Sequence, residues 1–284
     1  MPSTATLLTV AAMIIGGYGV LVAGMYLAQR SLLYLPSGQP MTPREAGVPE
    51  MRGVLLTTAD GLSLTAWHRP PVGDGVTLVY FHGNGGHIGY RGHRVRPFLD
   101  AGFGVLLVSY RGYGGNPGRP TEDGLYADGR AALAFLEARG FPPGRLVLFG
   151  ESLGGGVAVR LAWEQARAGS PVAAVVLEAP LSSVADVGAY HYPILPVRLL
   201  LKDRFDIVPL VGEIAAPLFV AHGEADLVVP IRFGRKVFDA ASEPKEAFWV
   251  DGGGHENLPA FGLHARVLRF LDRHLAAGAP RTGV

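Results

Sequence analysis

The sequence has few charged residues and contains no cysteine at all. Without cysteine, the chain cannot form disulfides, use a thiolate nucleophile or bind zinc through sulfur, and its compartment stays undetermined. Charged residues make up 17% of the 284 residues, and the formal net charge is +1. This balance predicts no general attraction to nucleic acid. The length is sufficient for one substantial hydrophobic core.

Charge is missing entirely from one long apolar stretch, residues 5–28. A transmembrane helix needs about 20 largely apolar residues, so this stretch is long enough to cross a bilayer. Arg30 ends the run, and Tyr26 and Tyr34 lie where aromatic side chains meet a membrane surface. We predict a single-pass transmembrane anchor over residues 1–30, with the lipid bilayer as the partner of residues 5–28.

Two other interpretations of this segment stay open. A cleaved signal peptide would have Lys or Arg before a shorter apolar run and a small-x-small cleavage site at its end. Here no Lys or Arg precedes the run, the run is longer, and no convincing cleavage site ends it. A buried or interfacial helix is compatible with the several glycines of the segment. If the segment is an anchor, Arg30 and Arg44 follow it, and the positive-inside rule places the rest of the chain on the cytoplasmic side.

A nucleophile motif, Gly-x-Ser-x-Gly, occupies residues 150–154. The apolar run before it predicts a buried strand, and the small, apolar residues after it predict a helix packed close to a sheet. A strand, a sharp turn and a helix hold a serine hydroxyl exposed on a strained backbone. Gly150 and Gly154 are required because a Cβ at either position would clash where the chain folds back. We therefore predict Ser152 as the nucleophile.

A serine nucleophile needs a base, and the base needs an acid that orients it. In hydrolases that carry this motif, the acid follows the serine in the chain and the histidine comes last. Asp226 lies in the turn just beyond a predicted strand at residues 217–221. Glu224 and Glu178 also follow predicted strands and remain alternatives for the acid.

The predicted base is His255. It follows a short predicted strand and three consecutive glycines, which leave the backbone free to direct the imidazole. His264 and His274 also come after the acid, but they fall in a helical pattern of apolar residues and fit a packing role better.

An oxyanion hole is predicted in the glycine-rich turn at residues 82–86, which follows a buried strand. Such a turn exposes backbone N–H groups. The N–H groups of Asn84 and Leu153 are the candidates for binding the oxyanion of a tetrahedral intermediate. Taken alone, the turn is equally typical of an ordinary strand-to-helix connection.

Together, these motifs resemble a known family. The chain is similar to the serine aminopeptidase/lysophospholipase-like α/β-hydrolases, in the membrane-anchored group related to protein depalmitoylases. The matching stretches are residues 82–86, 110–114, 150–155, 222–226 and 253–255. The resemblance places the nucleophile on Ser152, the acid on Asp226 and the base on His255, and it implies no metal and no organic cofactor. It is specific for the fold and says little about the substrate.

Alternating apolar runs and helical patterns predict an α/β-hydrolase fold with a mostly parallel, doubly wound sheet. We assign residues 31–52 to a juxtamembrane linker, residues 53–276 to the catalytic domain and residues 277–284 to a tail. Residues 182–215 form an insertion longer than a simple connection. A cap above the nucleophile and a helix packed on the sheet are equally compatible with its apolar residues.

Four residues are predicted to contact the substrate. They are His82 in the oxyanion turn, Tyr113 at the carboxyl edge of the sheet, Glu178 after a strand and His191 in the insertion. For Tyr113, bracing of a loop is an equally good interpretation.

The triad predicts a serine hydrolase that cleaves carboxylic esters or thioesters through an acyl-enzyme. The apolar insertion beside an anchor suggests a small acyl or lipid-like substrate. A peptidase or amidase on the same triad would need Glu178 or Glu224 to hold a substrate amine. A third hypothesis is a non-catalytic, membrane-tethered binding module, against which the complete triad argues. The oligomeric state is not indicated.

Overall fold

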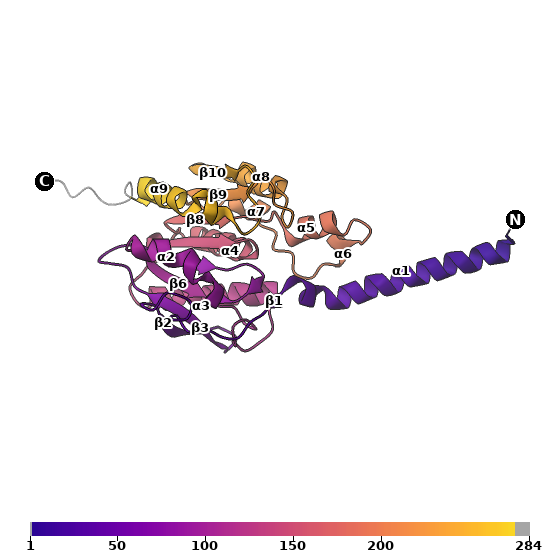
Figure 1. The fold of residues 1–284 in the computed structure, drawn as a ribbon, viewed down its shortest axis with the longest axis horizontal. Helices are drawn as coiled ribbons and strands as arrows, with labels where there is room; N and C mark the ends of the chain where they lie inside the picture. Colours follow the sequence, from indigo (N-terminus) through magenta and orange to yellow (C-terminus); the bar gives the residue numbers. More distant parts are fainter. Residues whose placement is uncertain (1, 276–284) are drawn as a thin grey trace.

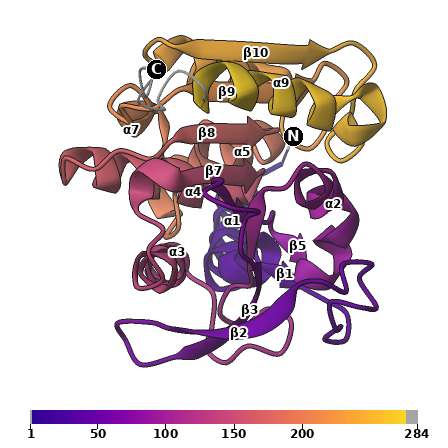
Figure 2. The same cartoon turned by 90° about the vertical axis from the view of Figure 1, so that its left-hand side faces the viewer.

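A computed structural model describes residues 2–275, and its centre is an eight-stranded sheet in the order β10-β9-β8-β7-β4-β6-β3-β2 (Figure 1). The strands are β2 Arg52–Thr57, β3 Ser63–Arg69, β4 Thr77–Phe81, β6 Gly104–Val108, β7 Leu146–Glu151, β8 Ala174–Glu178, β9 Leu218–Gly223 and β10 Lys245–Val250. In this sheet, β3 alone runs in the direction opposite to the other strands. The predicted mostly parallel sheet is confirmed, and Figure 2 shows β10 and β2 at its opposite edges.

Helices cover both faces of the sheet, because the central strands are apolar on both sides. Alternate residues of β4 show this: Leu78 and Tyr80 join the core on one face, and Val79 and Phe81 join the core on the other. The first face is covered by α2 Gly92–Asp100 and α9 Leu263–Leu275. The second face is covered by α3 Glu122–Glu137, α4 Leu153–Arg167, α7 Val208–Val211 and α8 Ile231–Ala240.

The ends of the elements follow local sequence signals. The Thr121 hydroxyl accepts a hydrogen bond from the Gly124 N–H and caps the start of α3. Gly61, with φ of 85°, turns the chain between β2 and β3, as its Asp-Gly pair predicts. Short 3-10 helices occupy η1 Ile88–Arg91, η2 Pro143–Arg145 and η3 Leu258–Phe261.

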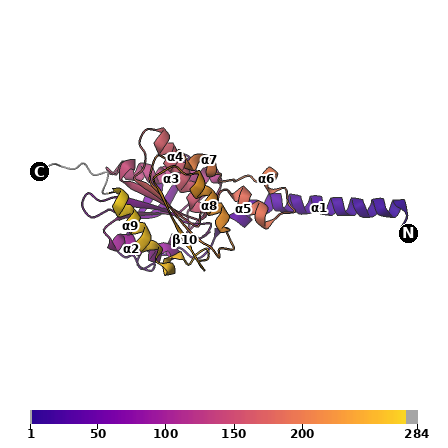
Figure 3. The same cartoon turned by 90° about the horizontal axis from the view of Figure 1, so that it is seen from above.

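The N-terminal helix α1 spans Thr4–Leu33, and Figures 1 and 3 show most of it projecting away from the domain. None of its residues is buried, and a mean hydropathy of 2.0 with 30 residues makes it long and apolar enough to cross a membrane. The helix continues three residues beyond the predicted end of the anchor. Tyr34 is only 3% exposed and packs in the core, so its predicted place at a membrane surface is wrong.

The predicted linker lies on the domain. Its first strand, β1 Leu35–Pro36, pairs in parallel with β5 Gly85–Gly86 in the glycine-rich turn. Further along, Val48 and Met51 are buried in the core beside α2. The predicted tail, residues 277–284, lies outside the described residues.

The insertion at residues 182–215 divides into two parts. Its first part holds α5 Val184–His191 and α6 Val197–Leu200, which lie beside the base of α1 (Figures 1 and 3). Its second part returns to the core, where Phe205, Ile207 and Val211 are fully buried. The first part is compatible with a cap and the second with packing on the sheet, and we refer to residues 184–203 as the cap.

Candidate active site

Ser152 lies between β7 and α4, at the carboxyl edge of the sheet. Its backbone has φ of 50° and ψ of −114°, a conformation that non-glycine residues rarely adopt. The Ser152 N–H donates to the Glu178 carbonyl oxygen at 2.8 Å, which fixes the turn. A Cβ at Gly154 would collide with the Phe81 carbonyl oxygen, and one at Gly150 would collide with Gly155. The glycines allow the chain to turn so sharply that the serine side chain is left at the edge of the sheet.

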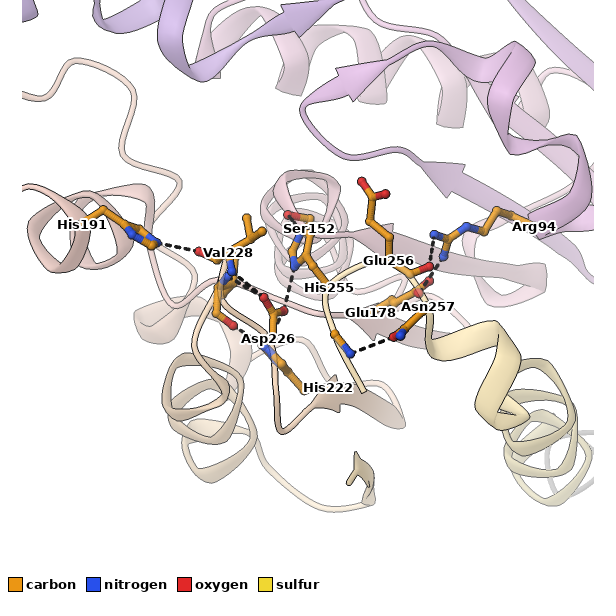
Figure 4. A network of polar contacts seen from close by, with 12 residues as sticks. Arg94, Ser152, Glu178, His191, His222, Asp226, Val228, His255, Glu256 and Asn257 are labelled. Carbon is orange, nitrogen blue, oxygen red and sulfur yellow. Dashed lines mark hydrogen bonds and ion pairs between the residues drawn. The ribbon is translucent and has the colours of Figure 1, made fainter. Parts of the chain in front are cut away.

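Ser152, His255 and Asp226 come together in one hydrogen-bonded line (Figure 4). The Ser152 Oγ lies 3.0 Å from His255 Nε2, and His255 Nδ1 lies 2.7 Å from Asp226 Oδ2. Since a carboxylate only accepts, Nδ1 carries the proton and Nε2 is left to accept from the serine hydroxyl. This tautomer is the one that general-base catalysis needs.

The Asp226 carboxylate is buried and held from several sides. Its Oδ1 accepts hydrogen bonds from the N–H groups of Val228 and Val229, both at 2.8 Å. Burial raises the pKa of Asp226, but hydrogen bonds from His222 and His255 outweigh burial and hold that pKa well below its usual range. The group therefore stays ionised and can stabilise a charged imidazole beside it.

His222 is a supporting residue that the sequence reasoning missed. Its buried Nε2 lies 2.7 Å from the Val229 carbonyl oxygen, to which it donates, and 3.2 Å from Asp226 Oδ2. A Cβ at Gly234 would collide with this ring, so α8 can pack against it only with glycine there. The fixed spacing between His222 and Asp226, four residues across a turn, is the signal that could have indicated the contact.

The predicted oxyanion donors, the N–H groups of Asn84 and Leu153, flank Ser152. Within residues 2–275, neither N–H donates a hydrogen bond, and both residues line the same cavity as Ser152. The Asn84 side chain is occupied elsewhere, since Nδ2 donates to the Leu33 carbonyl oxygen at 3.0 Å. The backbone N–H of Asn84 therefore stays available to an incoming oxyanion, while its side chain is tied to the end of α1.

A largely apolar cavity of about 480 Å³ opens beside Ser152. Its volume falls in the range of roughly 300–1,000 Å³ that is usual for small-molecule sites. The walls come from α1, the cap and the loop at residues 227–229. Among the side chains that line it are Leu181, Val184, Leu200 and His191.

A second cavity, of about 510 Å³, also adjoins the nucleophile and is more polar than the first. Ser152 and Asn84 line both cavities, so the reacting position lies between them. Arg91, His93 and Glu256 contribute to the walls of this second cavity. An ester whose carbonyl carbon lies at Ser152 could extend its acyl group into one cavity and its alcohol group into the other.

Three of the four predicted substrate contacts have buried side chains that line neither cavity. His82 is fully buried, its Nδ1–H donates to the Gly83 carbonyl oxygen at 2.7 Å, and burial lowers the pKa of its ring to about 3. Tyr113 is also buried, and its hydroxyl donates to the Asn84 carbonyl oxygen at 2.8 Å. Glu178 is 1% exposed and pairs with Arg94 at 2.7 Å. Only His191 lines a cavity.

The side chains of the alternatives for acid and base make contacts other than with the triad. Glu224 is exposed and pairs with Arg235 at 3.0 Å. His264 packs edge-on against Phe98, and His274 packs against Phe270. Glu178 contacts Arg94 and not the imidazole, and its burial raises its pKa to about 7 against the opposing effect of Arg94.

A buried ion pair supports the floor of the polar cavity. The Glu151 carboxylate, next to the nucleophile in sequence, accepts two hydrogen bonds from Arg91 and one from the Tyr80 hydroxyl. Burial raises the pKa of Glu151, but the charge and hydrogen bonds of Arg91 outweigh burial and bring that pKa to about 2. No periodic pattern in the sequence indicates this pair, because its members are 60 residues apart.

Related proteins align with most of this chain. A family model described as serine aminopeptidase, S33, matches residues 75–204. The uncharacterized protein Rv2307c of Mycobacterium tuberculosis is 40% identical over 258 residues, which cover 88% of this chain and 89% of that protein. Human protein ABHD12B is 36% identical over 212 residues, which cover 68% of this chain and 57% of that protein.

Solved structures share the fold. The esterase Pf2001 of Pyrococcus furiosus superposes with a TM-score of 0.69 and 22% identity, covering 85% of this chain and 99% of that one. The esterase RhEst1 of Rhodococcus sp. superposes with a TM-score of 0.62 and 21% identity, covering 79% and 99% of the two chains. At these identities, the likeness concerns the arrangement of the backbone.

Proposed function

The chain belongs to the α/β-hydrolases of the serine aminopeptidase S33 family, as its motifs predict, and on that premise we propose that it is a membrane-anchored serine esterase. The observation that carries the proposal is the line from Ser152 through His255 to Asp226, with hydrogen bonds of 3.0 and 2.7 Å. Esterases among the structures of the same fold support the reaction class.

In the proposed mechanism, His255 Nε2 takes the proton of the Ser152 hydroxyl while Oγ attacks the acyl carbon. Asp226 holds the imidazole by Nδ1 and stabilises the positive charge that forms on it. The N–H groups of Asn84 and Leu153 bind the oxyanion of the tetrahedral intermediate. The imidazolium then protonates the leaving alcohol or thiol, and a water molecule activated by His255 hydrolyses the acyl-enzyme.

The two cavities suggest what the ester looks like. The apolar cavity suits an acyl chain, because its lining offers few groups that could bind a polar one. The more polar cavity suits the alcohol or thiol that leaves. We therefore assign an acyl ester or thioester of a small polar partner as the substrate class.

We propose that α1 is an uncleaved anchor. Its last turns form hydrogen bonds with the cap and with the glycine-rich turn. Cleavage of the helix as a signal peptide would remove these hydrogen bonds. By the positive-inside rule, Arg30 and Arg44 after the helix favour a catalytic domain on the cytoplasmic side. Protease protection of the domain in sealed vesicles tests this orientation.

Amide hydrolysis has less support than ester hydrolysis. The two carboxylates that could hold a substrate amine are both engaged, Glu178 with Arg94 and Glu224 with Arg235. The binding-module hypothesis has no observation in its favour, since the triad geometry is complete.

The test is fluorophosphonate labelling of the detergent-solubilised protein, followed by hydrolysis of p-nitrophenyl esters from two to sixteen carbons. We expect labelling at Ser152 and ester turnover in the wild type. Ser152→Ala should lose both while folding normally, and Ser170→Ala, at an exposed serine, should lose neither. Turnover by Ser152→Ala close to the wild-type rate would refute the assignment.

A further inference from the structure

One wall of the apolar cavity is formed by the N-terminal helix itself. Val22, Met25, Tyr26 and Gln29 of α1 line the cavity, together with Leu32 and Leu33 at its end. Spacings of three and four residues place these side chains on one face of the helix. The same cavity reaches Ser152, so one continuous space joins the helix to the nucleophile.

This wall is held in place by polar contacts between α1 and the cap. The Tyr18 hydroxyl donates to the Ile194 carbonyl oxygen at 2.7 Å. The Gln29 side chain accepts from the Lys202 N–H at 2.7 Å, and Arg30 makes two hydrogen bonds, of 2.7 and 3.0 Å, to the buried Asp203. These contacts fix the position of the helix against the cap over more than two turns.

The length of α1 indicates where the cavity lies relative to a bilayer. A helix of 30 residues is about 45 Å long at 1.5 Å per residue, whereas the hydrocarbon core is about 30 Å thick. If the core begins near Thr4, about 20 residues cross it, and the remaining turns are the ones that line the cavity. The Tyr18 contact with the cap then lies within the apolar layer.

The surface around the cavity also suits a membrane. Ile194, Leu199 and Leu227 are 70%, 81% and 84% exposed, and Leu227 lines the cavity itself. Large apolar side chains gathered in this way mark a surface that contacts another apolar phase. Beside them, the Lys202 ammonium lies 4.2 Å from the centre of the Tyr26 ring, a pairing typical of membrane interfaces.

We propose that the apolar cavity opens to the bilayer between α1 and the cap, and that the acyl chain of a membrane-resident ester enters it from the leaflet. This inference rests on the proposed esterase function, because it names where the acyl group of that substrate comes from. The anchor is then part of the substrate site, and the scissile carbonyl reaches Ser152 at the membrane surface while the acyl chain stays in an apolar environment throughout.

The first test fills the cavity from the helix side. Met25→Trp places a bulky ring in the cavity, and Leu27→Trp places the same ring on the outward face of α1, where Leu27 is 79% exposed. We expect Met25→Trp to lower the ratio of kcat/KM for p-nitrophenyl palmitate to that for the butyrate by about tenfold or more. Leu27→Trp should leave this ratio unchanged. Equal ratios in both variants would overturn the proposal.

The second test asks where the substrate comes from. The full-length protein is reconstituted in dioleoylphosphatidylcholine vesicles, and methylumbelliferyl palmitate is placed either in the same vesicles or in separate ones. We expect hydrolysis to follow the mole fraction of ester in the enzyme's own bilayer and to be slow from separate vesicles. A rate that depends only on the bulk concentration of ester would contradict access from the leaflet.

Failure of this inference can be told apart from failure of the esterase function. If Ser152 is not labelled and p-nitrophenyl butyrate is not cleaved by the wild type, the proposed function fails and this inference falls with it. If the butyrate is cleaved and the palmitate ratio is the same in Met25→Trp as in the wild type, only the inference fails.

Discussion

The side-chain amide of Asn84 donates a hydrogen bond of 3.0 Å to the Leu33 carbonyl oxygen, at the last residue of the N-terminal helix. Two further contacts hold the same residue, since its carbonyl oxygen accepts from the Leu35 N–H at 2.9 Å and from the Tyr113 hydroxyl at 2.8 Å. The helix and the proposed oxyanion hole are thus one connected unit. A change at the end of the helix reaches the position where the tetrahedral intermediate would be bound.

Replacing Asn84 by alanine keeps the backbone N–H but removes its tether to Leu33. We expect kcat to fall by about tenfold, less than the loss for deleting an oxyanion donor outright, because the N–H remains but is less well fixed. KM should change little, since the side chain is engaged with the Leu33 carbonyl oxygen. Steady-state kinetics on a short ester gives both values. A raised KM with an unchanged kcat would identify Asn84 as a substrate contact instead.

Asp226→Asn should abolish most of the activity without unfolding the protein. The amide cannot hold the His255 Nδ1–H tautomer or stabilise the imidazolium, and the same change in serine proteases costs about 10⁴ in kcat. Glu224→Gln, two residues earlier and exposed, is the matched control and should keep full activity. Ester turnover and near-ultraviolet circular dichroism measure the two effects. Activity within a few fold of the wild type in Asp226→Asn would exclude it as the acid.

Gly154→Ala should destabilise the fold as well as the site. The added Cβ would collide with the Phe81 carbonyl oxygen, so the turn after the nucleophile or the end of β4 must move. We expect a loss of about 1–3 kcal/mol in stability, as for other overpacked sites. Gly53→Ala is the control, since a Cβ there meets nothing within 4 Å. Thermal unfolding followed by tryptophan fluorescence compares the two variants, which should differ clearly in Tm.

The Glu151–Arg91 pair should make the free energy of unfolding depend on pH in the acidic range. The folded-state pKa of Glu151, about 2, lies below the ordinary value of 4.5, so the contribution to stability is full above pH 4.5 and is lost as pH falls toward 2. This pKa shift sets an upper limit of about 3 kcal/mol on the contribution of the ionised Glu151 to the free energy of unfolding.

Urea unfolding of wild type and Glu151→Gln between pH 7 and pH 3 measures this contribution. The difference in unfolding free energy between the two proteins should be largest at pH 7 and shrink below pH 4.5. Glu137→Gln, at the exposed end of α3, should follow the wild-type curve throughout. A difference that stays constant with pH would show that Glu151 acts through packing alone.

Much of the fold could be predicted because its signals are local. Continuous apolar runs identify the strands of a doubly buried sheet, and the glycines around Ser152 report a turn that tolerates no Cβ. Chain order then selects Asp226 and His255, which the structure brings within hydrogen-bonding distance of each other. Their catalytic roles remain a prediction for the experiments above.

The rest depends on contacts that no local pattern records. Topology places His82, Tyr113 and Glu178 near the carboxyl edge of the sheet, but only packing decides that their side chains turn inward. Likewise, Tyr34 follows an apolar run yet lies in the core. The contact between α1 and the cap joins residues more than 170 positions apart, so periodicity in either segment could not reveal it.

The short pairing of β1 with β5 has a practical consequence for anyone who trims the protein to ease purification. A fragment that starts at Tyr34 keeps Leu35 and Pro36, which pair with the glycine-rich turn, but it loses the Leu33 carbonyl and the side chains of α1 that line the apolar cavity. Its turnover of water-soluble esters would report on the chemistry at Ser152. The same fragment would say nothing reliable about which acyl chains the intact enzyme selects, because the selecting surface has been cut away with the helix.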